Sequence, residues 1–204
     1  ITYLNLGFRL APTANQDNHL KNWGNSTTAR TGVLAPRLTK EDLIAALRAR
    51  HVFATTDKDL EVIAMVNSSL MGDVVDSSAL VVGQEIPLRL SVLDRAEGGA
   101  GSVHYIAEVY SDTAPGGAEA EIVEELEFDA APGTRKEVTI SNVVYTGPGQ
   151  YVFVELQQLT PDEDDADRAW TAPFWLEPTG SPPGTAGATL RIASLLPNSD
   201  TPEG

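Results

Sequence analysis

Hydrophobic and polar residues alternate along most of the chain from residue 58 onward, with the two-residue period of half-buried β-strands. Ile86, Leu88, Leu90 and Val92, for example, alternate with proline or polar residues. Similar runs cover residues 60–66, 103–110, 122–128, 138–140, 151–156 and 172–176. Segments rich in glycine and proline separate these runs. About seven short strands at this spacing predict an all-β, immunoglobulin-like sandwich over residues 58–178.

Residues 1–57 follow another pattern, in which strand, loop, helix and strand succeed one another. The apolar run Tyr3–Leu10 predicts a buried strand, and Val52–Thr55 predicts a second one. Between them, Thr39 is a candidate helix cap, and Leu43, Ile44 and Leu47 form an apolar stripe. Strands of this kind belong to a parallel sheet that is covered on both faces. We therefore expect residues 1–57 to be the last part of an α/β barrel whose other strands lie upstream.

Polar residues with metal-binding chemistry lie in the loop Asn15–His19 of this first segment. Asp17 offers a carboxylate oxygen and His19 an imidazole nitrogen, and the two residues are separated by one position. Asn18 is suited to hold the loop by bonding to its backbone. Arg30 follows the loop and is a candidate for bidentate binding of a substrate phosphate, although a structural ion pair explains it equally well.

The order of motifs in this segment resembles the end of a PHP-type metallohydrolase domain of the CehA/McbA-like group. Four segments carry the resemblance: Asn15–His19, Trp23-Gly24, Arg30-Thr31 and Ala46–Thr55. Residues 149–155 and 169–176 resemble, more loosely, the strands that follow the catalytic domain in that group.

The resemblance implies a phosphoesterase-like hydrolase. Asp17 and His19 would then be ligands of two or three clustered divalent ions, for which Zn²⁺, Mn²⁺ and Fe²⁺ are candidates. The remaining ligands of the family, a His-x-His pair, a glutamate and another histidine, have no counterpart in residues 1–16. The expected partners are therefore the upstream portion of the same PHP domain and a small-molecule or phosphate-ester substrate. The 204-residue chain by itself is expected to be inactive.

Composition narrows the choice of partners. The formal net charge of −15 disfavours nucleic acids and anionic membrane surfaces, and no apolar run is long enough to span a bilayer. The absence of cysteine removes disulfides and thiolate metal sites. The strong acidity favours an extracellular or periplasmic location.

Other polar and aromatic residues are expected to have structural roles. Trp23 is expected to pack under the loop, His51 to be structural, and His104 to be solvated on a sandwich strand. The acidic run 162–167 has the oxygen ligands that Ca²⁺ prefers but not the spacing of an EF-hand loop, so a solvated connection is the expected role.

The sequence allows alternative interpretations of the C-terminal residues and of the overall function. Residues 179–187 have the composition of a linker, and residues 188–204 resemble the first strand of a lamin-tail-like domain or form a tail. The main hypothesis is the C-terminal part of a metal-dependent hydrolase. The competing hypothesis is that the β-sandwich of an exported multidomain protein is the working part, as a module that binds glycans or another protein, or serves as a structural spacer.

Overall fold

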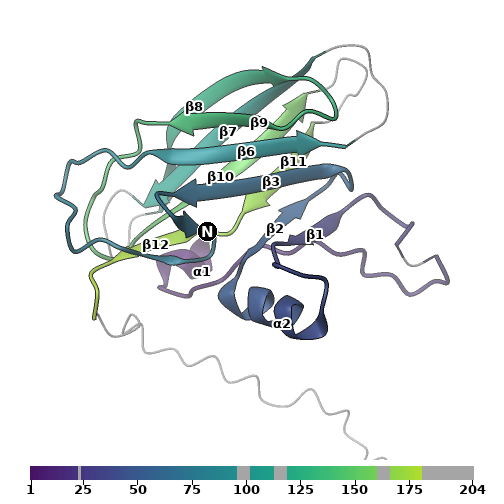
Figure 1. Cartoon of the computed structure of the whole chain (residues 1–204), viewed down its shortest axis with the longest axis horizontal. Coiled ribbons are helices and arrows are strands. Elements are labelled where there is room, and N and C mark those ends of the chain that lie inside the picture. The colour runs from purple at the N-terminus through teal and green to yellow at the C-terminus, as the bar shows by residue number, and fades with distance from the viewer. Residues whose placement is uncertain (23, 96–101, 113–118, 160–165, 181–204) are drawn as a thin grey trace, which may run out of the picture.

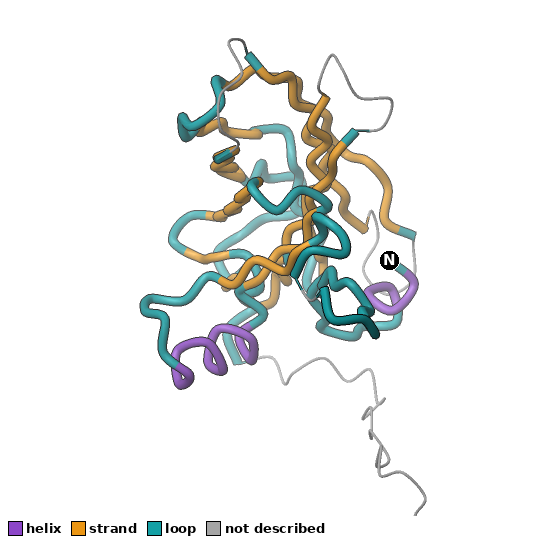
Figure 2. The backbone as a smooth tube through the Cα atoms, turned by 90° about the vertical axis from the view of Figure 1, so that its right-hand side faces the viewer, coloured by secondary structure: helices purple, strands orange, loops and turns teal. Residues whose placement is uncertain are grey.

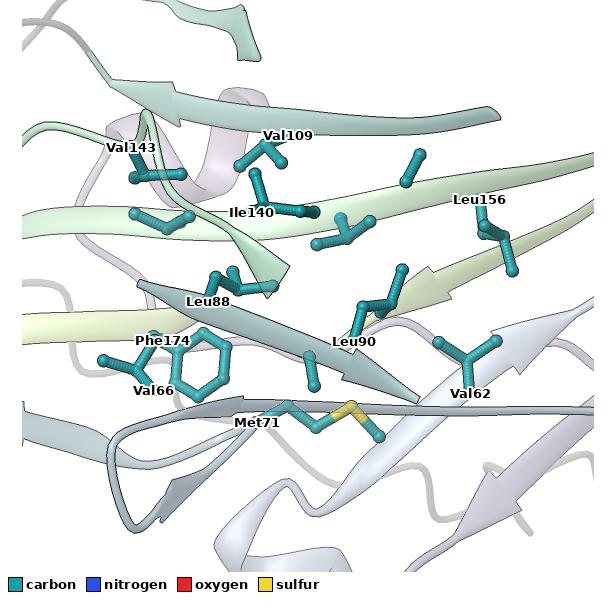
Figure 3. Close-up of a cluster of buried hydrophobic side chains, with 14 of the residues drawn as sticks. Val62, Val66, Met71, Leu88, Leu90, Val109, Ile140, Val143, Leu156 and Phe174 are labelled. Atoms are coloured by element: carbon teal, nitrogen blue, oxygen red, sulfur yellow. The ribbon is translucent and has the colours of Figure 1, made fainter. Parts of the chain in front are cut away.

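In the described part of the chain, the strands form two stacked sheets, and the two helices lie outside the stack (Figures 1 and 2). The structure is a computed structural model, and it describes residues 1–22, 24–95, 102–112, 119–159 and 166–180. In the close-up of Figure 3, side chains from both sheets point into the space between the sheets. This arrangement is that of a β-sandwich, as the alternation from residue 58 onward predicts.

The larger sheet has eight strands and is centred on β10 (Gln150–Leu159). β7 (Val103–Asp112) pairs along one side of β10, and β8 (Ala120–Ala130) forms the edge beyond β7. The other side of β10 is shared by β11 (Asp167–Thr171) and β12 (Phe174–Glu177). β12 pairs in parallel with β5 (Val74–Asp76), whereas the other pairings of this sheet are antiparallel.

The smaller sheet has four strands in the order β4-β3-β6-β9. Their bounds are Ser69–Leu70 for β4, Leu60–Val66 for β3, Leu88–Asp94 for β6 and Lys136–Ile140 for β9. Burial alternates along β3, and Leu88, Leu90 and Val92 of β6 are almost completely buried, as the sequence predicts. The core that these residues form with β7, β10 and β12 contains no disulfide and is built from aliphatic and aromatic side chains.

The predicted α/β barrel remnant is wrong. β1 (Arg30–Val33) and β2 (Val52–Thr55) are antiparallel to each other, with α2 (Lys40–Ala49) between them. β2 then pairs antiparallel with β11, so both strands extend the larger sheet of the sandwich. A strand-helix-strand pattern does not specify the direction of the second strand, because the second pairing partner of β2, strand β11, lies more than a hundred residues further along the chain.

The predicted strand at Tyr3–Leu10 is also wrong. Residues Thr2–Asn5 form the short helix α1, and residues 6–22 and 24–29 contain no helix or strand. The backbone amides of Asn5 and Leu6 bond to the carbonyls of Ile1 and Thr2. The apolar residues Leu4, Leu6, Phe8 and Leu10 do alternate with Asn5, Gly7 and Arg9. The chain nevertheless turns at Gly7, whose φ is 81°, and Leu4 packs against aromatic residues on the outer face of the larger sheet. Residues 1–29 therefore form an irregular segment beside the sandwich.

Helix α2 is confirmed, but its apolar stripe is less buried than predicted. The hydroxyl of Thr39 accepts a hydrogen bond from the Asp42 amide at 3.3 Å, which is the predicted cap. Ala46 is buried, whereas Ile44 and Leu47 are 38% and 51% exposed. None of the helices in the described part of the chain has the length and apolar character to cross a bilayer.

Candidate functional site

The loop Asn15–His19 places its two predicted metal ligands next to each other. The Asp17 Oδ1 and His19 Nε2 atoms are 3.5 Å apart, and the two side chains are 92% and 86% exposed. Asp17 has a φ of 40°, in the left-handed region that aspartate adopts more readily than most residues. This backbone conformation, with one residue between the two ligands, brings both side chains to the same point on the surface.

The neighbouring polar side chains are used to hold the loop. The Asn15 and Asn18 carboxamides accept bonds from the Asp17 and Leu20 amides at 3.0 and 2.7 Å. The Gln16 carboxamide accepts from the Gly24 amide at 3.0 Å and donates to the Thr27 carbonyl at 2.7 Å. These are the local side chain–backbone bonds that asparagine and glutamine make in place of regular structure. The loop is therefore fixed by its amide side chains, while Asp17 and His19 point outward.

Arg30 lies at the base of the same loop, at the start of β1. Its guanidinium donates to the carbonyls of Thr27 at 2.9 Å, Ala29 at 2.7 Å and Gly24 at 2.6 Å. In this arrangement the side chain ties the loop to the sheet. The expected binding of a substrate phosphate by Arg30 stays a prediction.

Within the described ranges, no three histidine, cysteine, aspartate or glutamate side chains are grouped closely enough to hold a metal ion. Among these residues, Asp17 and His19 are thus a pair without a third such ligand. A carboxylate oxygen with an imidazole nitrogen fits Zn²⁺, Mn²⁺ or Fe²⁺, but two donors fill only part of a coordination shell. Trp23 and residues 162–165 of the acidic run lie outside the described residues.

The other two histidines also contact carboxylates. His51 Nε2 lies 2.8 Å from Asp73 Oδ1, where the end of α2 meets the turn before β5. His104 Nδ1 lies 2.9 Å from Asp129 Oδ1 on the outer face of β7 and β8. The first contact agrees with a structural role for His51. The second shows that His104 is paired and not simply solvated.

A cleft that the sequence does not reveal lies between residues 1–12 and the outer face of the larger sheet. Its volume is about 360 Å³. The lining is mostly apolar, and it includes Tyr3, Leu10, Tyr110, Phe153 and Trp170. The rings of Tyr110 and Phe153 stack with their centroids 5.0 Å apart. The cleft therefore offers aromatic faces to a ligand.

Polar groups at the edge of this cleft are few and already paired. The Glu155 carboxylate bonds to Arg168 at 2.7 Å, and the Tyr110 hydroxyl donates to Glu108 at 3.1 Å. Burial, followed by the bond to Glu108, raises the pKa of Tyr110 to about 12, so this hydroxyl stays neutral at physiological pH. Periodicity alone does not find the cleft, because its two walls come from the irregular first residues and from strands more than a hundred residues away.

Neither a protein-family model nor a curated protein matches this sequence.

Proposed function

We propose that this chain is the C-terminal part of a metal-dependent, phosphoesterase-like hydrolase, in which Asp17 and His19 are two ligands of a multinuclear divalent site. The observation that carries the proposal is the meeting of these two side chains at one exposed point, 3.5 Å apart, on a loop that other side chains hold in place. The order of motifs from Asn15 to Thr55 supports the same assignment.

The chain's own residues have defined tasks in this proposal. Asp17 and His19 bind and orient the ions, and Gln16 and Arg30 fix the loop that presents them. When bound, the ions supply Lewis-acid activation of the ester and a lowered pKa for water. Arg30 keeps guanidinium donors beyond those bonded to the loop carbonyls, and these are available for a phosphate oxygen.

The missing ligands are proposed to come from an upstream portion of the same domain, which packs against this chain. Support comes from apolar side chains that the described residues leave uncovered on and beside α2. Leu38, Ile44 and Leu47 are 92%, 38% and 51% exposed, although the latter two belong to the stripe that predicts a buried helix face. An upstream domain that covers this face accounts for the exposure. An extracellular or periplasmic location is proposed with this assignment, because of the acidity of the chain.

The test uses the protein at the full length that its gene encodes, with metal content and hydrolysis of bis(p-nitrophenyl) phosphate as readouts. A double variant, Asp17→Ala with His19→Ala, is expected to lose at least about tenfold in metal affinity and to lose hydrolysis. The matched control is His104→Ala with Asp129→Ala, which removes another histidine–carboxylate pair and leaves both readouts unchanged. Unaltered metal content and activity in the first double variant would refute the proposal.

A second candidate function is binding of a small ligand with an apolar face by the β-sandwich, and the aromatic cleft is the observation that favours it. A volume of about 360 Å³ lies within the range of small-molecule sites. Titration with 1-anilinonaphthalene-8-sulfonate should give saturable fluorescence that Phe153→Ala reduces and that Val81→Ala, on an exposed turn, does not. Equal fluorescence with both variants counts against a ligand site in the cleft.

A further inference from the structure

One end of the sandwich gathers acidic side chains from several elements. β6 ends at Asp94 where β3 begins, since Asp94 and Leu60 are paired in the smaller sheet (Figure 1). The turn from β2 to β3 carries Asp57 at the same end. In the larger sheet, Gln158 of β10 is paired with Tyr105 on one side and Asp167 on the other. The Gln158 amide donates to Asp94 Oδ2 at 3.1 Å, so it joins the two sheets across the core.

The Gln158 carboxamide has an unusual environment. Gln158 is 4% exposed, and its side-chain Oε1 atom is buried without any hydrogen-bond partner. The donation from Nε2 to Asp94 fixes the orientation of the amide, because the flipped amide would place Oε1 against a carboxylate oxygen. A buried acceptor without a donor is unfavourable, because it has lost its hydrogen bonds to water and gained none in the protein. A bound cation would satisfy this oxygen, since carboxamide oxygens are ordinary cation ligands.

Several carboxylates interact at this end of the sandwich. Burial raises the pKa of Asp57 above its usual value, and the nearby charges of Asp167, Asp94 and Asp59 add to this effect. Two nearby arginines bond to glutamates. Arg95 bonds to Glu61 at 2.9 Å, and Arg168 bonds to Glu155 at 2.7 Å.

We propose that this end of the sandwich binds a single Ca²⁺ ion through Asp94, Asp57 and the Gln158 carbonyl oxygen. The donors are all oxygen, which Ca²⁺ prefers and Zn²⁺ does not. Among the residues that the structure describes, no three histidine, cysteine, aspartate or glutamate side chains form a metal-binding group. The proposed site therefore has two carboxylates, and its third side-chain donor is a carboxamide. Water and backbone carbonyls complete the shell. This low charge count corresponds to a Kd of about 10⁻⁴–10⁻³ M, the range of extracellular calcium modules.

The experiment is a Ca²⁺ titration of the 204-residue chain at constant ionic strength, followed by calorimetry and by thermal unfolding. One ion is expected to bind, and Tm is expected to rise by about 3–6 °C at a free Ca²⁺ concentration ten times the Kd. Tb³⁺ replaces Ca²⁺ in a parallel titration, because a bound lanthanide near Tyr105 emits when the phenol is excited. Absence of both binding heat and a Ca²⁺-specific rise in Tm overturns the proposal.

Variants separate a site from general charge screening. Asp57→Asn keeps the size of a partly exposed side chain and should weaken Ca²⁺ binding at least tenfold, and Gln158→Glu should strengthen it. Asp129 is an acidic residue on the outer face of the larger sheet, and Asp129→Asn should bind Ca²⁺ as the unaltered protein does. If Asp129→Asn lowers the affinity as much as Asp57→Asn, or if Mg²⁺ replaces Ca²⁺ equally well, the assignment is wrong. Asp17→Ala should leave Ca²⁺ binding unchanged, so this test is independent of the proposed hydrolase site.

Discussion

Residues 1–29 and the β-sandwich are held in shape by different interactions. In the sandwich, backbone ladders and a continuous apolar core fix the strands, and residues such as Val62 and Leu90 have no exposed surface. In the described residues of the first segment, the only regular element is the four-residue α1, and carboxamide side chains bond to the backbone in place of a ladder.

The difference has a functional consequence. A packed core leaves little freedom for its side chains, because each one is needed to fill space. A loop held by its own carboxamides can expose other side chains without loss of packing. Asp17 and His19 are exposed in this way, so a substitution of either residue should leave folding unchanged and should affect only the proposed metal binding. Substitutions in the two regions should therefore have unequal effects on stability.

The largest contrast is in the cost of removing an apolar side chain. Phe174 is fully buried between the sheets, and Phe174→Ala should lower the free energy of unfolding by about 3–5 kcal/mol. Leu20 is 70% exposed, and Leu20→Ala should change it by less than about 0.5 kcal/mol. Urea unfolding measures both values. A loss above 2 kcal/mol for Leu20→Ala would show that the first segment has a core contact of its own.

Two glycines with similar backbone angles give the next contrast. Gly72 and Gly24 have φ values of 96° and 83°. A Cβ atom at Gly72 would lie 2.4 Å from the Arg50 carbonyl oxygen, whereas one at Gly24 has no neighbour within 4 Å. Gly24→Ala should therefore cost about 1 kcal/mol for the backbone angle alone, and Gly72→Ala should cost about 1–3 kcal/mol because the turn must also shift. Thermal unfolding compares the two, and equal costs would contradict the close approach.

A smaller effect is expected from the charge of Asp112. Burial raises the pKa of this carboxyl, although a bond from the Tyr151 amide at 2.8 Å opposes the shift. The folded state then binds more protons than the unfolded state, so this contribution to stability is present below the unfolded pKa and is lost as pH rises through the folded pKa. Asp112→Asn keeps the acceptor and removes the charge. Its urea midpoint should exceed that of the unaltered protein at pH 7 and match it at pH 3, whereas Asp17→Asn should change neither.

The sequence predicts the sandwich well, because alternation is a local property that survives in any packing of the sheets. β3 is found at the predicted residues 60–66, and β6 has the predicted buried face. Residues 1–57 are predicted less well, because β1 and β2 join the sheet only through a distant strand, β11, which pairs with β2. β2 has the expected bounds but pairs with β11 and not with a parallel barrel strand.

The candidate sites show the same limit. Two residues in one loop can be assigned from spacing, and Asp17 and His19 do lie together. The aromatic cleft and the Asp94–Gln158 contact join residues 64 or more positions apart, so they require the fold. Ile44 and Leu47 show the opposite situation. Their spacing correctly predicts a helix, but no described residue packs over these two side chains enough to bury them.

The smallest effect on stability is expected for a substitution within the loop Asn15–His19. Gln16→Ala removes the acceptor of the Gly24 amide and of the Ser26 hydroxyl, and also the donor to Thr27. Because these bonds are exposed, the free energy of unfolding should fall by no more than about 1 kcal/mol. Amide hydrogen exchange at Gly24 should nevertheless become much faster, while exchange in β10 is unchanged. If the proposed metal site exists, the same variant should weaken metal binding by the full-length protein, although Gln16 is not one of the proposed ligands, because Asp17 and His19 are no longer held together. Equal exchange at Gly24 in both proteins would mean that the loop is fixed by Arg30 and the asparagines alone.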